Sequence, residues 1–401
     1  MFNSRRKTVE DKEVMKIGIL TFHSQLNYGG VLQCWALQTV LEKMGHEVVV
    51  IDRWLEDGRD INNTVYDRMG CRKWARFLVR ALFGLGDLNY WLRVRRTKKW
   101  LKSSLNLTSY HFVEWKDAPK DLGVDIIVVG SDQVWHVGDW GDPSVYLLEG
   151  APKIPAIAYA ASLGLSEVPT EFIDLYKRGL AKFRAISCRE REGVEICKRL
   201  GFDATHVVDP TLLSFCRDSA ERKARGDLVC YFLSESVDTH WQELEEFAHK
   251  NKCKARVLQD CARLLPLPSK LSRIKQWLKW QIRKLLSPVR IMDSAGPKEF
   301  LAVFQNASWV VSDSFHAMMF SICNGCNVRI IRPTSEKRRR MFARIAEFAA
   351  HTEGPSVVDS VSAALDSLSK GEKVTYDYEW INRRRSESLD WLSHNLTIDK
   401  I

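Results

Sequence analysis

The segment 16–52 restricts the possible fold more than any other part of this chain. It contains an apolar run at 16–22, a loop ending in two glycines at 23–30, a helical pattern at 31–44 and a second apolar run at 47–51. Short continuous apolar runs are typical of strands that are covered on both faces. Strand, loop, helix and strand in this order predict a βαβ unit, and therefore a parallel sheet of the doubly wound type.

Further apolar runs continue this pattern, and each is followed directly by polar or glycine residues. They lie at 125–129, 154–159, 185–187 and 205–208. Because the carboxyl ends of parallel strands meet at one edge of a sheet, we expect the residues after these runs to form a ligand site.

The chain has 401 residues, which is more than one ordinary hydrophobic core organises, so two domains are expected. We predict an N-terminal Rossmann-like domain at 15–220, with a basic helical insert at about 60–108. A C-terminal Rossmann-like domain is predicted at 221–376, with a second basic insert at about 263–290. The last helix, within 377–401, has an apolar face and is predicted to pack back on the first domain.

The stretch near the end of the second domain places a histidine where chemistry is possible. An apolar strand at 309–311 is followed by three polar residues, and a helix is expected at about 315–323. His316 then lies in the first turn of this helix, where free N–H groups and the helix dipole favour an anion. A helix-capping cluster with a polar histidine explains the same residues, so this stretch alone does not decide between the two.

Positive charge is concentrated in the two inserts. Residues 68–102 hold eleven Lys or Arg and one acidic residue, residues 263–290 hold eight and none, and the rest of the chain has a net charge of −8. Nucleic-acid binders usually carry positive charge on the folded core, so no nucleic-acid partner is expected. In the second insert apolar residues recur every three or four positions: Leu271, Ile274, Trp277, Leu278, Ile282 and Leu285. Such a stripe usually packs on the core, but beside so many cations it also fits a helix lying in an anionic membrane surface.

The sequence indicates a cytoplasmic protein. No apolar run reaches the ~18 residues of a membrane span, and the first 14 residues lack the apolar core of a signal peptide. Ten cysteines without dense spacing suit a reducing compartment. Peripheral attachment to the inner face of the membrane follows if the inserts bind lipid. No residues have the spacing of a metal site, so no metal is predicted.

Seven short motifs follow one another between about residues 16 and 335. They are 27–29 (NYG), 130–135 (GSDQVW), 159–162 (YAAS), 187–190 (SCRE), 209–211 (DPT), 296–300 (GPKEF) and 314–317 (SFHA). Each motif is weak by itself, but the ordered set resembles the polysaccharide pyruvyl transferase family. The resemblance implies a GT-B-like fold, in which two Rossmann-like domains face each other across a cleft.

The resemblance also implies an activity. Members of the family transfer the pyruvyl group of phosphoenolpyruvate to a sugar of a cell-surface polysaccharide precursor, forming a pyruvate ketal. Phosphoenolpyruvate is then a co-substrate, no cofactor is needed, and the acceptor is a sugar or a lipid-linked oligosaccharide. Such a reaction needs a proton donor for the enol carbon, a base for the sugar hydroxyls and positive charge for the phosphate.

Catalytic and donor-binding candidates follow from these motifs. His316 and Asp132 are the candidate acid–base residues, and Arg189, Ser314 and Arg340 are the candidates for binding the donor. Many relatives have an Arg at the position of Ser314, so another Arg has to supply that charge here. Asp132 as a turn residue and Arg189 in an ordinary ion pair remain alternatives.

Acceptor-binding candidates lie in the first two motifs. They are Asn27, Tyr28, Gly29 and Gln133, although each of the polar side chains also suits bonding to a loop backbone. Two other functions stay open: a GT-B glycosyltransferase that uses a nucleotide sugar, and a non-catalytic membrane-associated scaffold of the same fold.

Overall fold

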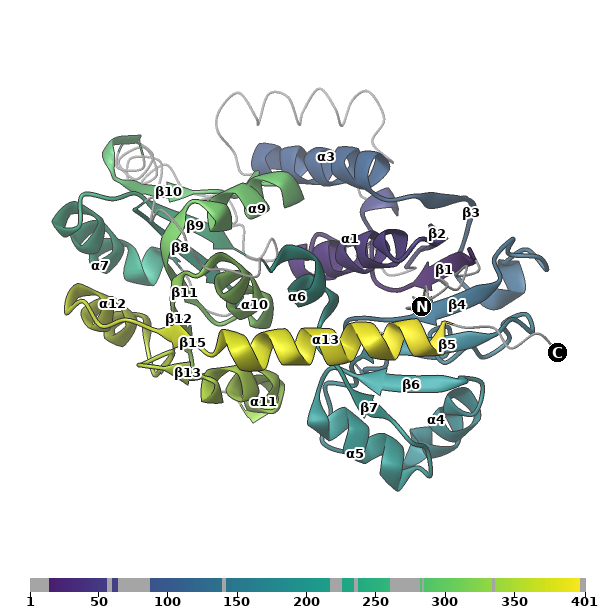
Figure 1. Ribbon diagram of the computed structural model, residues 1–401. Coiled ribbons are helices and arrows are strands. Elements are labelled where there is room, and N and C mark those ends of the chain that lie inside the picture. Colours follow the sequence, from purple (N-terminus) through teal and green to yellow (C-terminus); the bar gives the residue numbers. More distant parts are fainter. Residues whose placement is uncertain are drawn as a thin grey trace, which may run out of the picture.

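The computed structural model contains two parallel sheets, each with helices packed against it (Figure 1). The residues that it describes are 14–55, 60–63, 87–138, 142–216, 226–233, 237–259, 282, 285–333 and 336–396. Residues 64–86 of the first basic insert and most of the second, including 263–281, therefore lie outside the described residues.

The first sheet has seven parallel strands in the order β3-β2-β1-β4-β5-β6-β7. The strands are β1 Lys16–Leu20, β2 Glu47–Arg53, β3 Leu107–Phe112, β4 Ile126–Val129, β5 Ala156–Ala161, β6 Ala185–Cys188 and β7 Thr205–His206. Strands β2 and β3 are added on one side of β1, and strands β4 to β7 on the other. The loops after β1 and β4 therefore lie at the position where doubly wound sheets bind ligands. Every residue of β4 and β5 is buried, as expected for continuous apolar runs.

Helix α1 (Tyr28–Lys43) begins three residues earlier than the apolar spacing predicts. The side-chain oxygen of Asn27 accepts a hydrogen bond from the N–H of Gly29 at 2.9 Å. This N-cap satisfies a backbone donor that the first helical turn leaves free, so the helix extends through both glycines of the loop.

The first insert does not remain helical to its end. Helix α3 (Asp87–Ser104) is followed by β3, which pairs with β2 along the edge of the sheet. The prediction of a helical insert up to residue 108 is therefore wrong at this end. In β3 only Phe112 is buried, and such a half-exposed edge strand lacks the continuous apolar run that marks the central strands.

The second sheet has six parallel strands in the order β10-β9-β8-β11-β12-β14. They are β8 Asp227–Phe232, β9 Ala255–Gln259, β10 Val289–Ile291, β11 Ala307–Ser312, β12 Asn327–Ile331 and β14 Val357–Val358. The predicted fold class, two Rossmann-like α/β domains in a GT-B-like pair, is confirmed. The remaining helices of more than five residues in the described chain are α4 Ile173–Leu180, α5 Arg191–Arg199, α6 Pro210–Phe215, α7 Val237–Lys250, α9 Pro297–Gln305, α10 Phe315–Asn324, α11 Glu336–Ala350, α12 Val361–Ser369 and α13 Tyr378–Asn395.

Apolar packing joins the two sheets into one body. The ring of Tyr28, from α1, stacks on Phe300 of α9 with ring centroids 4.5 Å apart, and the Tyr28 hydroxyl donates to the carbonyl of Ala295 at 2.7 Å. One continuous cluster of buried residues includes strands and helices of both domains. The apolar core therefore continues across the boundary between the two domains.

The last helix, α13, extends from the second sheet to the first (Figure 1, yellow). The Ser388 hydroxyl oxygen accepts from the N–H of Val208 at 3.0 Å, and Arg384 donates to the carbonyl of His206 at 2.9 Å. The helix therefore bonds directly to the last strand of the first sheet and to the loop after it.

Within the described chain, no helix is both long and apolar enough to cross a bilayer.

Candidate active site

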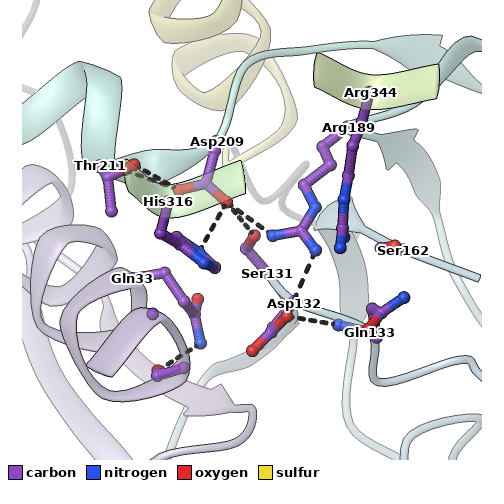
Figure 2. A network of polar contacts seen from close by, with 12 residues as sticks. Gln33, Ser131, Asp132, Gln133, Ser162, Arg189, Asp209, Thr211, His316 and Arg344 are labelled. Atoms are coloured by element: carbon purple, nitrogen blue, oxygen red, sulfur yellow. Dashed lines mark hydrogen bonds and ion pairs between the residues drawn. The ribbon is translucent and has the colours of Figure 1, made fainter. Parts of the chain in front are cut away.

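Polar side chains from both domains meet beyond the carboxyl ends of the first sheet (Figure 2). Four strands deliver residues within three positions of their ends, and helices α10 and α11 of the second domain complete the group. The members are Asp132 after β4, Ser162 after β5, Arg189 and Glu190 after β6, Asp209 after β7, His316 on α10 and Arg344 on α11. The strand-end pattern of the sequence therefore leads to one cluster.

Arg189 is the centre of this cluster and is bonded to three carboxylates. Its Nη1 donates to Asp209 Oδ2 at 2.8 Å, its Nη2 to Asp132 Oδ1 at 3.2 Å and its Nε to Glu190 Oε1 at 3.1 Å. Only 1% of its side chain is exposed. Burial alone would lower the pKa of Arg189, but the charges of Glu190, Asp132 and Asp209 raise it above the ordinary value. The guanidinium group is thus a fixed part of the site.

Asp209 is a buried carboxylate with four donors. Its Oδ1 accepts from the N–H and the hydroxyl of Thr211 at 3.0 and 2.7 Å, and its Oδ2 accepts from Ser131 and Arg189. Although burial raises the pKa of Asp209, Arg189, His316 and these hydrogen bonds lower it below the ordinary value, so the group is ionised. Its sequence context, before Pro210 at a helix start, has the pattern of a plain N-cap, and no role was predicted for it.

His316 occupies the first turn of α10, as predicted. Its Nε2 lies 4.0 Å from Asp209 Oδ2 and has no hydrogen-bond partner among the described residues. Burial lowers the pKa of His316 to about 4, against the opposing effect of Asp209. The imidazole is therefore neutral near pH 7 and free to accept a proton.

Gly29 leaves the space that the His316 ring fills. A Cβ atom at this position would lie 2.1 Å from His316 Nδ1, a separation that no side chain can adopt. The lack of a side chain at position 29 therefore makes room for the imidazole. This explains the glycine better than the predicted acceptor contact does.

Asp132 has an unusual backbone conformation. Its φ angle is +70°, in the left-handed region that costs energy for a residue with a side chain. Oδ1 accepts from the N–H of Gln133 at 2.9 Å, and a Cβ atom at Gly30 would lie 3.1 Å from Oδ2. Backbone strain of this kind persists where the surrounding structure fixes it, and it is concentrated at functional sites.

Several buried polar atoms of this cluster have no partner. In native structures nearly all such atoms are hydrogen-bonded, so a group of exceptions in one place indicates a site for a polar ligand. Within the described part of the chain they are Gln33 Oε1, Gln133 Nε2, Glu190 Oε2, His316 Nε2 and Arg344 Nε. Gln33, Glu190 and Arg344 were not predicted as site residues.

The other predicted residues have different surroundings. The side-chain oxygen of Asn27 caps α1, and the buried hydroxyl of Tyr28 is bonded to Ala295 at the domain boundary. Ser314 is the N-cap residue of α10 and is 3% exposed; its N–H donates to the Ser312 hydroxyl oxygen at 3.1 Å. Arg340 belongs to α11, but its side chain lies outside the described residues.

A family model described as polysaccharide pyruvyl transferase matches residues 27–335, which is most of the chain. The chain belongs to this family. The match includes the strand ends and the α10 start that form the cluster. No curated protein matches this pyruvyl transferase family member.

Solved structures similar to this family member include two UDP-GlcNAc 2-epimerases and a glycosyltransferase. The UDP-GlcNAc 2-epimerase from Neisseria meningitidis has a TM-score of 0.46 at 10% identity, covering 95% of this chain and 99% of the epimerase. The Methanocaldococcus jannaschii UDP-GlcNAc 2-epimerase has 0.42 at 14% identity, covering 89% and 91%. A glycosyltransferase from Streptomyces sp. SF2575 has 0.37 at 13% identity, covering 94% and 96%. At these scores the similarity says nothing about chemistry.

Proposed function

We propose that this protein transfers the pyruvyl group of phosphoenolpyruvate to two hydroxyls of a sugar in a cell-surface polysaccharide precursor. The observation that carries the proposal is the group of unpartnered buried atoms around a neutral histidine, in a chain of the pyruvyl transferase family. Donors and acceptors are both present, as recognition of an anion and of sugar hydroxyls requires.

The reaction balances without a cofactor. A proton adds to the CH₂ carbon of phosphoenolpyruvate, and two sugar hydroxyl oxygens bond to the neighbouring carbon. The bond from that carbon to the phosphate oxygen breaks. The hydroxyls release two protons, of which one stays on the new methyl group and one leaves with the phosphate.

His316 is suited to the proton transfers of this reaction. A neutral imidazole accepts a hydroxyl proton at Nε2, and the resulting imidazolium is stabilised by the carboxylate of Asp209 4.0 Å away. Asp132 is the proposed second acid–base group, since one of its oxygens is bonded to Arg189 and the other lies near Gly30. Gln133 Nε2 and Glu190 Oε2 are available to bond to the acceptor.

Ligand binding separates this proposal from its rivals. We expect phosphoenolpyruvate to raise the melting temperature of the purified protein and nucleotide sugars to leave it unchanged. The opposite result would favour a GT-B glycosyltransferase, and no effect of either ligand would favour a non-catalytic scaffold. Release of phosphate from phosphoenolpyruvate in the presence of acceptor glycans then tests transfer directly.

The acceptor is proposed to be a lipid-linked glycan, reached at an anionic membrane surface. Three apolar side chains before β10 support this: Ile282, Leu285 and Leu286 are 57%, 75% and 81% exposed. Ile282 and Leu285 belong to the apolar stripe of the second insert, and the other members of the stripe lie outside the described residues. A stripe that packed on the core would bury these residues.

A further inference from the structure

Arg344 lies beside the start of the helix that carries His316. Its guanidinium group is 5.1 Å from the centre of the Phe315 ring, and that of Arg189 is 4.9 Å from the same ring. Phe315 stands between Ser314 and His316 in the chain, and Ser314 brings no charge to this place. Figure 2 shows the two arginine side chains running next to each other toward the cluster.

The two arginines differ in how their donors are used. Arg189 bonds to three carboxylates, whereas the one ion pair found for Arg344 within the described residues joins its Nη1 to Glu190 Oε1 at 3.6 Å. That oxygen already accepts from the Ser162 hydroxyl at 2.7 Å and from Arg189 at 3.1 Å. The Nε of Arg344 has no hydrogen-bond partner in the part of the chain that the structure describes. The planar fork of Arg344 is therefore largely unoccupied.

An unoccupied fork at this depth is costly. Only 10% of the Arg344 side chain is exposed, and a buried charge without good partners destabilises a protein. Burial and the nearby charge of Arg189 lower the pKa of Arg344 to about 10. We infer that the missing partner of the Arg344 guanidinium is a bound ligand.

Docking of helix α11 does not need this charge. Glu347, one turn after Arg344, pairs with Arg191 and with His206 Nε2 across the domain boundary, each at 3.3 Å. Arg384 donates to His206 Nδ1 at 3.0 Å, so Nε2 carries the ring hydrogen; it donates to the Arg189 carbonyl at 3.2 Å and also lies close to Glu347. Since Glu347 anchors the helix, the guanidinium of Arg344 is available to a ligand.

We propose that Arg344 binds the anionic oxygens of the donor. This rests on the proposed use of phosphoenolpyruvate and names the residue that holds it. A guanidinium fork donates two parallel hydrogen bonds to a phosphate or a carboxylate, which suits either end of this molecule. An anion bound there lies next to His316, where the proton transfers are proposed.

Titration calorimetry with the purified full-length protein tests the proposal. We expect Arg344→Met to weaken phosphoenolpyruvate binding on the order of 10–100-fold, the effect of losing hydrogen bonds to a charged group. Arg344→Lys keeps the charge without the fork and is expected to bind several-fold more weakly than the wild type. Arg178→Met is the matched control, because Arg178 is 60% exposed on α4 and pairs only loosely with Glu149 at 3.7 Å. Parallel titrations with inorganic phosphate and with pyruvate show which end of the donor Arg344 contacts.

The outcomes separate this inference from the proposed function. If the wild type binds phosphoenolpyruvate and both Arg344 variants bind it equally well, Arg344 is not the donor-binding residue and the proposed function stands. If the wild type does not bind phosphoenolpyruvate, both fail. Circular dichroism checks the fold of each variant, and Arg344→Lys decides the question if Arg344→Met does not fold.

Discussion

The two domains contribute unequal halves to the candidate site. The first domain presents a network in which Arg189 joins the carboxylates of Asp132, Glu190 and Asp209, so most of its charges are already paired. The second domain presents His316 and Arg344, whose Nε2 and Nε atoms have no partner among the described residues. The difference indicates that the first domain supplies a frame of paired charges and leaves Gln33, Gln133 and Glu190 one unpartnered atom each, whereas the second domain supplies the two basic groups that lack a partner.

The strongest test of this contrast is removal of the unpaired imidazole. We expect His316→Ala to lower ketal formation by ~10²–10⁴-fold, the usual contribution of an acid–base residue, and to leave the fold intact. Phosphate release and circular dichroism measure the two effects. His249→Ala, an exposed histidine near the end of α7, is the control. Activity of His316→Ala close to that of the wild type would remove the residue from the mechanism.

The pH dependence of stability tests whether the ring is neutral. The unfolded chain binds a proton at an ordinary histidine pKa of 6.5, whereas the folded protein binds it at about 4. Stability due to the neutral ring is therefore complete above pH 6.5 and is lost as the pH falls toward 4. We expect the wild type to lose up to roughly 3 kcal/mol more than His316→Gln over this range. The free energies of unfolding come from denaturant titrations at pH 7, 5.5 and 4.5. An equal change with pH in the wild type and in His316→Gln would contradict this.

The frame is tested at Arg189. Arg189→Lys keeps the charge but loses hydrogen bonds to buried carboxylates, so we expect a loss of about 1–3 kcal/mol in the free energy of unfolding. Phosphoenolpyruvate affinity should change less than in the Arg344 variants. Arg332→Lys, in an exposed pair with Asp359, serves as the control. A large loss of donor affinity without a loss of stability would instead place Arg189 on the donor, as the sequence motif alone suggested.

The smallest expected effects concern the surface of the second domain. Replacing Ile282, Leu285 and Leu286 by Ser should reduce co-sedimentation with anionic vesicles. A second variant reverses four charges of the insert, at positions outside the described residues: Lys275→Glu, Lys279→Glu, Arg283→Glu and Lys284→Glu. It should release the protein further, because each cation near the membrane contributes ~1 kcal/mol to binding. Neutral vesicles and high salt are the controls, and negligible binding under all conditions would exclude membrane attachment.

Sequence patterns predicted the fold where burial is complete. Strands β4 and β5 are buried along their whole length, so their apolar runs were recognisable, whereas the edge strand β3 was not predicted. Asp132, Arg189 and His316 were predicted because they follow strand ends or a helix start, but Glu190 and Asp209 also follow strand ends and were missed.

The other two missed residues come from different positions. Gln33 and Arg344 lie inside helices, where a single polar residue looks like any solvent-facing side chain. Gln33 is held by Thr21, Phe22 and Gly30 of its own domain, whereas the place of Arg344 in the site depends on how the two domains pack, which no local pattern records.

The contact between Gly29 and His316 also constrains how this enzyme can evolve. Because the ring occupies the volume of a missing methyl group, the two positions cannot change independently. A lineage that gained any side chain at position 29 would have to shift or give up the imidazole in the same step, and with it the proposed chemistry. Selection on position 29 is therefore selection on a residue 287 positions away in the other domain.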